Sequence, residues 1–66
     1  MTMTSSWIDS VEYDAVTSTA TMYLTNGESY DYEDIPESTV DEWESSESAG
    51  RFHNTHIRGN FDAVKR

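Results

Sequence analysis

The 66-residue sequence contains no cysteine, so neither disulfides nor thiolate-bound zinc can stabilise the fold. A chain of this length buries only about 60% of the surface that its unfolded form exposes. The fold must therefore be a single small domain that depends on one hydrophobic core and on its hydrogen bonds.

Long hydrophobic runs are also missing, and none approaches the ~20 residues that a membrane-spanning helix needs. The first six residues are not basic, and no apolar stretch of the kind found in signal peptides follows them. We expect a cytoplasmic protein that does not enter a membrane. Its domain is expected to span residues 6–61, with flexible tails at 1–5 and 62–66.

Basic residues are absent from the first fifty positions, which carry twelve acidic side chains. The last sixteen positions hold Asp62 and all four basic residues, namely Arg51, Arg58, Lys65 and Arg66. The net charge of the chain is −9. Any surface that attracts anions is therefore expected near the C-terminal end, where all the basic residues lie. Three explanations of the acidity stay open: solubility, adaptation to a salt-rich cytoplasm, and imitation of nucleic acid.

Alternation of apolar and polar residues predicts three antiparallel strands, at about 6–13, 19–25 and 28–33. The first strand is out of phase at Ile8, which predicts a bulge or a bend near Asp9-Ser10. Between the second and third strands, Asn26-Gly27 predicts a tight hairpin in which both residues have positive φ.

The third strand directs Tyr30 and Tyr32 to the same face, and a helix that begins near Pro36 is expected to cover them. Val40 and Trp43 are three residues apart, so they share the covering side of that helix. A second short helix is expected between 51 and 58. The fold class is α+β, a three-stranded antiparallel meander followed by one or two short helices packed on one face. The expected core comprises Val11, Tyr13, Met22, Leu24, Tyr30, Tyr32, Ile35, Val40, Trp43, Phe52 and Ile57.

A series of landmarks in this order resembles the KTSC domain, a family named for its place at the C-terminus of some lysyl-tRNA synthetases. They are Tyr13, Gly27, Tyr30-Asp31-Tyr32, Ile35-Pro36, Ser48-Ala49-Gly50, Phe52, Asn54 and Ile57-Arg58. The resemblance extends from about Ser6 to Phe61. It implies a domain that also occurs alone, and for which RNA binding is a hypothesis drawn from the synthetase context. His53 departs from the family pattern, which has a large apolar residue there.

Six residues are candidates for binding, and each also has a structural explanation. Tyr30 and Tyr32 either pack under the helix or form a platform on which nucleic-acid bases stack. Ser48 either caps the second helix or, with Arg51, Arg58 and Asn54, surrounds an anion.

Catalytic and metal sites are not expected. His53 and His56 are three residues apart and Asp62 follows, but two histidines and one carboxylate make a poor metal signature. The chain carries no nucleophile motif and no phosphate-binding glycine loop, and it is too small to hold a large ligand cavity beside its core. We therefore expect no enzyme activity, no cofactor and no small-molecule ligand.

Two functional hypotheses follow. The first is a non-catalytic interaction module that binds a protein or, through Arg51, Arg58, Lys65 and Arg66, an RNA. The second is a small phage-type or regulatory protein whose acidic surface imitates nucleic acid and blocks a basic partner. The identity of the partner and the oligomeric state stay open.

Overall fold

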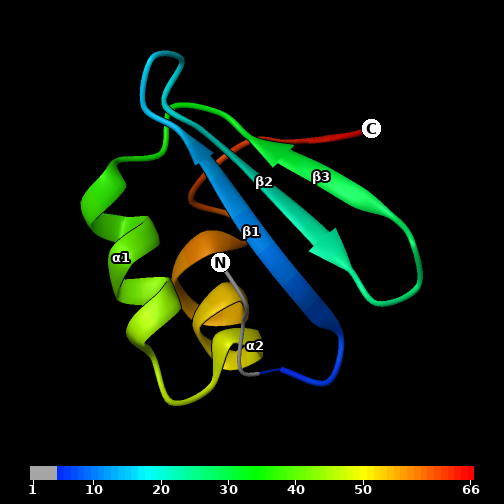
Figure 1. Cartoon of the computed structure of the whole chain (residues 1–66). Coiled ribbons are helices and arrows are strands. Elements are labelled where there is room, and N and C mark those ends of the chain that lie inside the picture. The colour runs from blue at the N-terminus through cyan, green and yellow to red at the C-terminus, as the bar shows by residue number, and fades with distance from the viewer. Residues whose placement is uncertain (1–4) are drawn as a thin grey trace.

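The computed structural model describes residues 5–66, and its helices lie on one face of an antiparallel sheet (Figure 1). The sheet has the order β1-β2-β3-β4, with β1 at Ile8–Asp14, β2 at Thr19–Leu24, β3 at Ser29–Tyr32 and β4 at Ala63–Lys65. Between β3 and β4 lie α1 at Glu37–Ser45, α2 at Ala49–Phe52 and the π-helical turn η1 at His53–Ile57. No helix within residues 5–66 is long and apolar enough to cross a membrane.

The α+β class is confirmed, but the prediction of three strands is wrong because β4 adds a fourth. Val64 of β4 pairs with Asp31 of β3, antiparallel, and Arg66 donates its backbone N–H to the carbonyl of Ser29 at 3.0 Å. All three residues of β4 are exposed, so their sequence shows no apolar alternation. The segment expected to be a tail at 62–66 contains this strand, whereas residues 1–4 of the other expected tail lie outside the described part.

Of the bulge or bend predicted near Asp9-Ser10, the structure shows a bulge, because Ile8 faces Leu24 while Ser10 faces Tyr23. The β2–β3 hairpin also forms where expected, but only Gly27 of its turn has positive φ, at 92°. Its three-residue loop is closed by the bond from the N–H of Leu24 to the carbonyl of Glu28, at 2.8 Å. In such a loop a single left-handed residue follows an ordinary turn, so Asn26 does not need positive φ.

The core lies between the sheet and the helices, and Trp43 of α1 is fully buried in it. The Trp43 ring meets the Tyr32 ring edge-on with centroids 6.3 Å apart, and Trp43 Nε1 donates to the carbonyl of Ala49 at 3.0 Å. The predicted cover of β3 by the helix after Pro36 is therefore confirmed at Tyr32. The buried apolar residues are Ile8, Val11, Ala20, Met22, Tyr32, Ile35, Val40, Trp43, Ala49 and Ile57, with Tyr13, Leu24, Tyr30 and Phe52 partly buried around them.

Two local features of the helices concern the N-terminus of α1 and the packing of α2. No side chain of the described residues caps the N-terminus of α1, where Pro36 occupies the N-cap position. Gly50 lies buried inside α2, where a Cβ atom would come within 2.6 Å of the Trp7 indole nitrogen. A glycine at this position allows the indole of Trp7 to lie directly against the backbone of α2.

Candidate functional site

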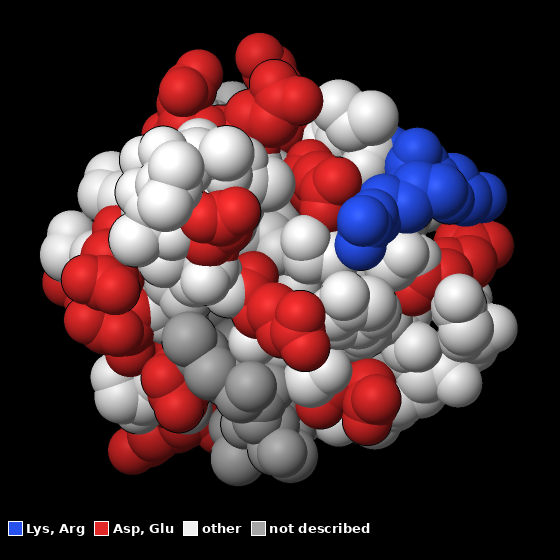
Figure 2. All heavy atoms as spheres, turned by 45° about the horizontal axis from the view of Figure 1, so that its top comes forward, with Lys and Arg blue, Asp and Glu red and all other residues white. Residues whose placement is uncertain are grey.

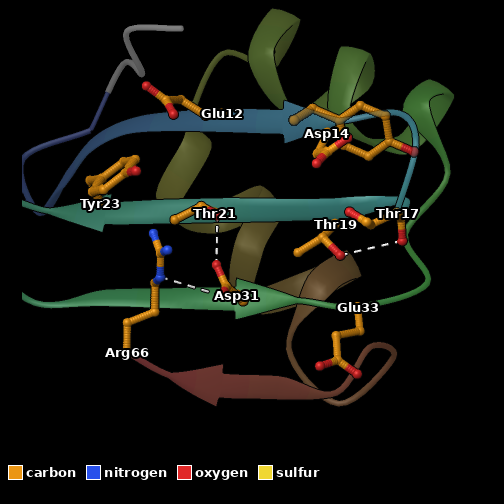
Figure 3. A pocket seen from close by; sticks show the side chains of 10 residues that line it. Glu12, Asp14, Thr17, Thr19, Thr21, Tyr23, Asp31, Glu33 and Arg66 are labelled. Carbon is orange, nitrogen blue, oxygen red and sulfur yellow. Dashed lines mark hydrogen bonds and ion pairs between the residues drawn. The ribbon is translucent and has the colours of Figure 1, made fainter.

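The face of the sheet opposite the helices is open, and its side chains line a shallow hollow of about 520 Å³ (Figure 3). Its lining includes Thr17, Thr19, Thr21 and Tyr23, which belong to β2 and the turn before it. Four carboxylates lie among and around them, from Glu12 and Asp14 of β1, Asp31 of β3 and Glu33 just after β3. The only basic side chain lining this hollow within residues 5–66 is that of Arg66.

The register of the strands sets the spacing of these carboxylates. Glu12 faces Thr21 and Thr21 faces Asp31, so the three residues form one row across the sheet. Asp14 faces Thr19 and lies two residues further along β1 than Glu12. Since a strand rises about 3.3 Å per residue, the two carboxylates of β1 lie about 7 Å apart along the strand.

Asp31 is the most constrained of the four carboxylates. Its Oδ1 accepts a hydrogen bond from the Thr21 hydroxyl at 2.6 Å, and its Oδ2 lies 3.5 Å from Nε of Arg66. The Asp31 side chain is only 27% exposed, because it lies between its neighbours on the sheet surface. It therefore presents a fixed oxygen to a cation.

The four basic residues predicted to attract anions do not form one site. Lys65 and Arg66 each pair with a carboxylate, Lys65 with Glu28 at 3.4 Å and Arg66 with Asp31. Arg51 and Arg58 are exposed in the helical part of the chain and form no salt bridge within residues 5–66. Figure 2 shows acidic side chains spread over the visible face, with the basic side chains that are visible there confined to one edge.

The two candidate tyrosines do not form a platform for bases. Tyr32 is buried, and its hydroxyl lies 2.5 Å from Nε2 of His53. Tyr30 is half-buried against the core, with its hydroxyl 3.3 Å from Oε2 of Glu28. Packing in and around the core therefore explains both tyrosines of the Tyr30-Asp31-Tyr32 motif.

His53 belongs to the core, where its ring meets Trp7 edge-on with centroids 5.2 Å apart. Nδ1 of His53 lies 3.3 Å from Oδ1 of Asn54, so a neutral ring that donates from Nδ1 accepts at Nε2 from the Tyr32 hydroxyl. Burial lowers the pKa of His53, and burial raises the pKa of Tyr32. This pair replaces the large apolar residue that the resemblance implies at position 53.

The remaining candidates are divided between capping and a second hollow. Ser48 accepts a hydrogen bond from the backbone N–H of Arg51 at 3.3 Å, which confirms its predicted capping role. Ser48 and Arg51 also line an open hollow of about 550 Å³ together with Phe52, Thr55 and His56. Neither Asn54 nor Arg58 lines this hollow, so the four polar candidates are not brought together.

Within residues 5–66, no three histidine or acidic side chains are placed to share a metal ion. His53 faces the core, whereas the His56 ring packs against Phe52 at a tilt of 44°, with ring centroids 4.6 Å apart. The acidic hollow was not among the sites predicted from the sequence. The signal for it was the alternation of apolar and polar residues in neighbouring strands, with Asp and Glu on the polar side of each.

Comparison with known proteins agrees with this architecture. The family model of the KTSC domain matches residues 4–61. A crystal structure of a KTSC domain protein from Yersinia pestis is similar, with a TM-score of 0.90 and 30% sequence identity over 100% of this chain and 93% of that one. A search of curated proteins gives no match. The predicted resemblance is confirmed, and the chain belongs to the KTSC domain family.

Proposed function

We propose that this KTSC domain is a non-catalytic interaction module that binds a basic, extended segment of a partner protein on the open face of its sheet. The observation that supports this most is the charge of that face. Four carboxylates and one guanidinium line the hollow. A cationic segment complements this charge distribution, and such complementarity accelerates encounter and selects among partners.

The spacing of the carboxylates favours an extended partner. Glu12 and Asp14 lie two residues apart on β1, and Asp31 and Glu33 lie two residues apart along β3 and its end. In an extended peptide the side chains at positions i and i+2 share a face and are also about 7 Å apart. A peptide with arginine or lysine at every second position would therefore match the spacing of either pair of carboxylates.

The same features weigh against RNA as the ligand of this face. Single-strand binders combine a basic groove with exposed aromatic rings. Here Tyr32 is buried, Tyr30 is bonded to Glu28, and two of the four cations already pair with carboxylates. RNA binding through Arg51 and Arg58 stays as an alternative outcome of the test.

The proposal includes the second hypothesis as a special case. If the partner's basic segment itself binds nucleic acid, the acidic face competes for it and blocks that activity. Displacement of a bound oligonucleotide from the basic peptide by the domain would identify this case.

The test uses a fluorescein-labelled peptide in which arginine alternates with threonine, and measures its anisotropy at two salt concentrations. The triple variant Glu12→Gln/Asp14→Asn/Glu33→Gln is expected to bind more weakly, by about 3- to 160-fold if each exposed pair contributes about 0.2–1 kcal/mol. The matched control removes three exposed carboxylates of α1, as Asp41→Asn/Glu42→Gln/Glu44→Gln.

Three outcomes decide the matter. A loss of peptide affinity in the Glu12/Asp14/Glu33 variant alone supports the proposal. An equal loss of affinity in both triple variants means that only the net charge attracts the peptide, and this result contradicts the proposal. If a single-stranded RNA binds in place of the peptide and substitution of Arg51 and Arg58 abolishes that binding, RNA is the ligand instead.

A further inference from the structure

We infer that the hollow on the open face is an arginine site, and that Arg66 is its built-in occupant, which an arginine of the partner must displace. This inference rests on the proposed function and names the side chain that the face recognises. It begins from the position of Arg66, which lies in the hollow although it follows the last strand.

The backbone of Arg66 is anchored beside β3 by its hydrogen bond to Ser29. Its side chain reaches from there over β3, and Figure 3 shows the guanidinium ending near Tyr23 and Thr21 of β2. The charged contact is the one to Oδ2 of Asp31. The chain therefore places one of its own guanidinium groups where the carboxylates of the face are concentrated.

The surroundings favour a guanidinium over an ammonium group. The Thr21 hydroxyl holds Oδ1 of Asp31, which fixes the carboxylate and leaves Oδ2 for the cation. Tyr23 supplies an aromatic ring in the same hollow. A planar guanidinium can stack on such a ring while it bonds to a carboxylate, whereas an ammonium group is a compact, strongly hydrated charge.

The contact of Arg66 is weak enough to be exchanged. Its side chain is 52% exposed, and a single distance of 3.5 Å joins it to Asp31. For exposed ion pairs of this kind, the ratio of the paired to the unpaired state is about 1 to 5. Glu12 and Asp14 form no salt bridge within residues 5–66, so an incoming segment can replace Arg66 and engage these carboxylates as well.

The experiment compares Arg66→Gln with Lys65→Gln. Both variants remove one positive charge from the same end of the chain. Lys65 faces Tyr30 in the register and pairs with Glu28, so its side chain is on the other side of β4 from the hollow. Only Arg66→Gln removes the internal competitor. Its affinity for the alternating arginine peptide is expected to exceed that of Lys65→Gln by about two- to six-fold.

A second measurement tests the site without the peptide. N-acetylarginine amide is titrated into Arg66→Gln, and backbone amide signals are followed by nuclear magnetic resonance. Saturable shifts are expected at Thr21, Tyr23 and Asp31, at lower concentration than in Lys65→Gln, and they should be weaker with N-acetyllysine amide. Adding Asp31→Asn to Arg66→Gln is expected to remove them.

The outcomes separate the two proposals. If arginine amide gives no saturable shifts in Arg66→Gln, or equal ones in both single variants, the arginine site is overturned whatever the peptide does. If those shifts occur but the peptide does not bind the wild-type chain or either variant, the site holds and the proposed function fails.

Discussion

Replacing Gly50 by alanine tests how α2 is packed against the segment that enters β1. An alanine Cβ at this position would lie 2.6 Å from Nε1 and 3.3 Å from Cε2 of Trp7. The indole must therefore move. It is a rigid ring held edge-on against His53, with an interplanar angle of 81°, so it cannot yield as the end of a flexible side chain would.

Two opposing effects decide the sign of the change in stability. Alanine in place of glycine inside a helix stabilises by about 1 kcal/mol. Overpacking a buried site costs about 1–3 kcal/mol, and loss of the edge-on contact between Trp7 and His53 costs about 0.5–1.5 kcal/mol more. The steric cost exceeds the gain in propensity, so Gly50→Ala should lower the free energy of unfolding by about 0.5–3.5 kcal/mol.

Thermal unfolding followed by circular dichroism measures this effect, since 1 kcal/mol shifts the Tm of a domain of this size by about 4–8 °C. The control is the same substitution in Trp7→Ala, where the indole no longer blocks the Cβ. There Gly50→Ala should raise the Tm, because only the helix propensity term remains. A Gly50→Ala protein that melts at or above the wild-type Tm, or an effect of the same sign in both backgrounds, would refute this account of the packing.

Two further predictions concern the core. Trp43→Ala should lower the free energy of unfolding by about 3–5 kcal/mol, because the ring is fully buried and its Nε1 donates to the carbonyl of Ala49. A urea titration should show that the variant is largely unfolded even without urea, and a stable, folded variant would contradict the packing of α1. The free energy of unfolding should also fall as the pH decreases below about 6.5, since burial lowers the pKa of His53 in the folded state and the unfolded chain then binds more protons. The stability that neutral His53 contributes is fully present above pH ~6.5, the ordinary pKa of histidine. It is lost as the pH falls from there through the lower pKa of His53 in the folded state. The double variant Tyr32→Phe/His53→Leu should lack it, and an unchanged pH dependence in that variant would assign it to other groups.

Much of the fold could be predicted because its signals are local. The alternation of Ala20 and Met22 with threonine identified β2 and its buried side, and the phase change at Ile8 indicated a bulge or a bend. The spacing of Val40 and Trp43 identified the covering face of α1. Each signal depends on residues a few positions apart, where strand and helix periodicity determines which side chains share a face.

The candidate site was predicted less well. Conspicuous residues such as Tyr32 and Ser48 proved to be explained by packing and helix capping. The open acidic face consists of ordinary polar residues that become a surface only when β1, β2 and β3 align. Their register brings Glu12, Thr21 and Asp31 into one row although they are about ten residues apart in sequence.

The sequence by itself determined the α+β class, the sides of the strands that enter the core, and the excess of negative charge. Only the tertiary structure decided that β4 joins the sheet, that Trp7 packs on Gly50, and that Arg66 lies against Asp31. The physical reason is separation along the chain. Periodicity constrains near neighbours, whereas these three contacts join segments 31 to 43 residues apart, and closure of the chain around the core selects them.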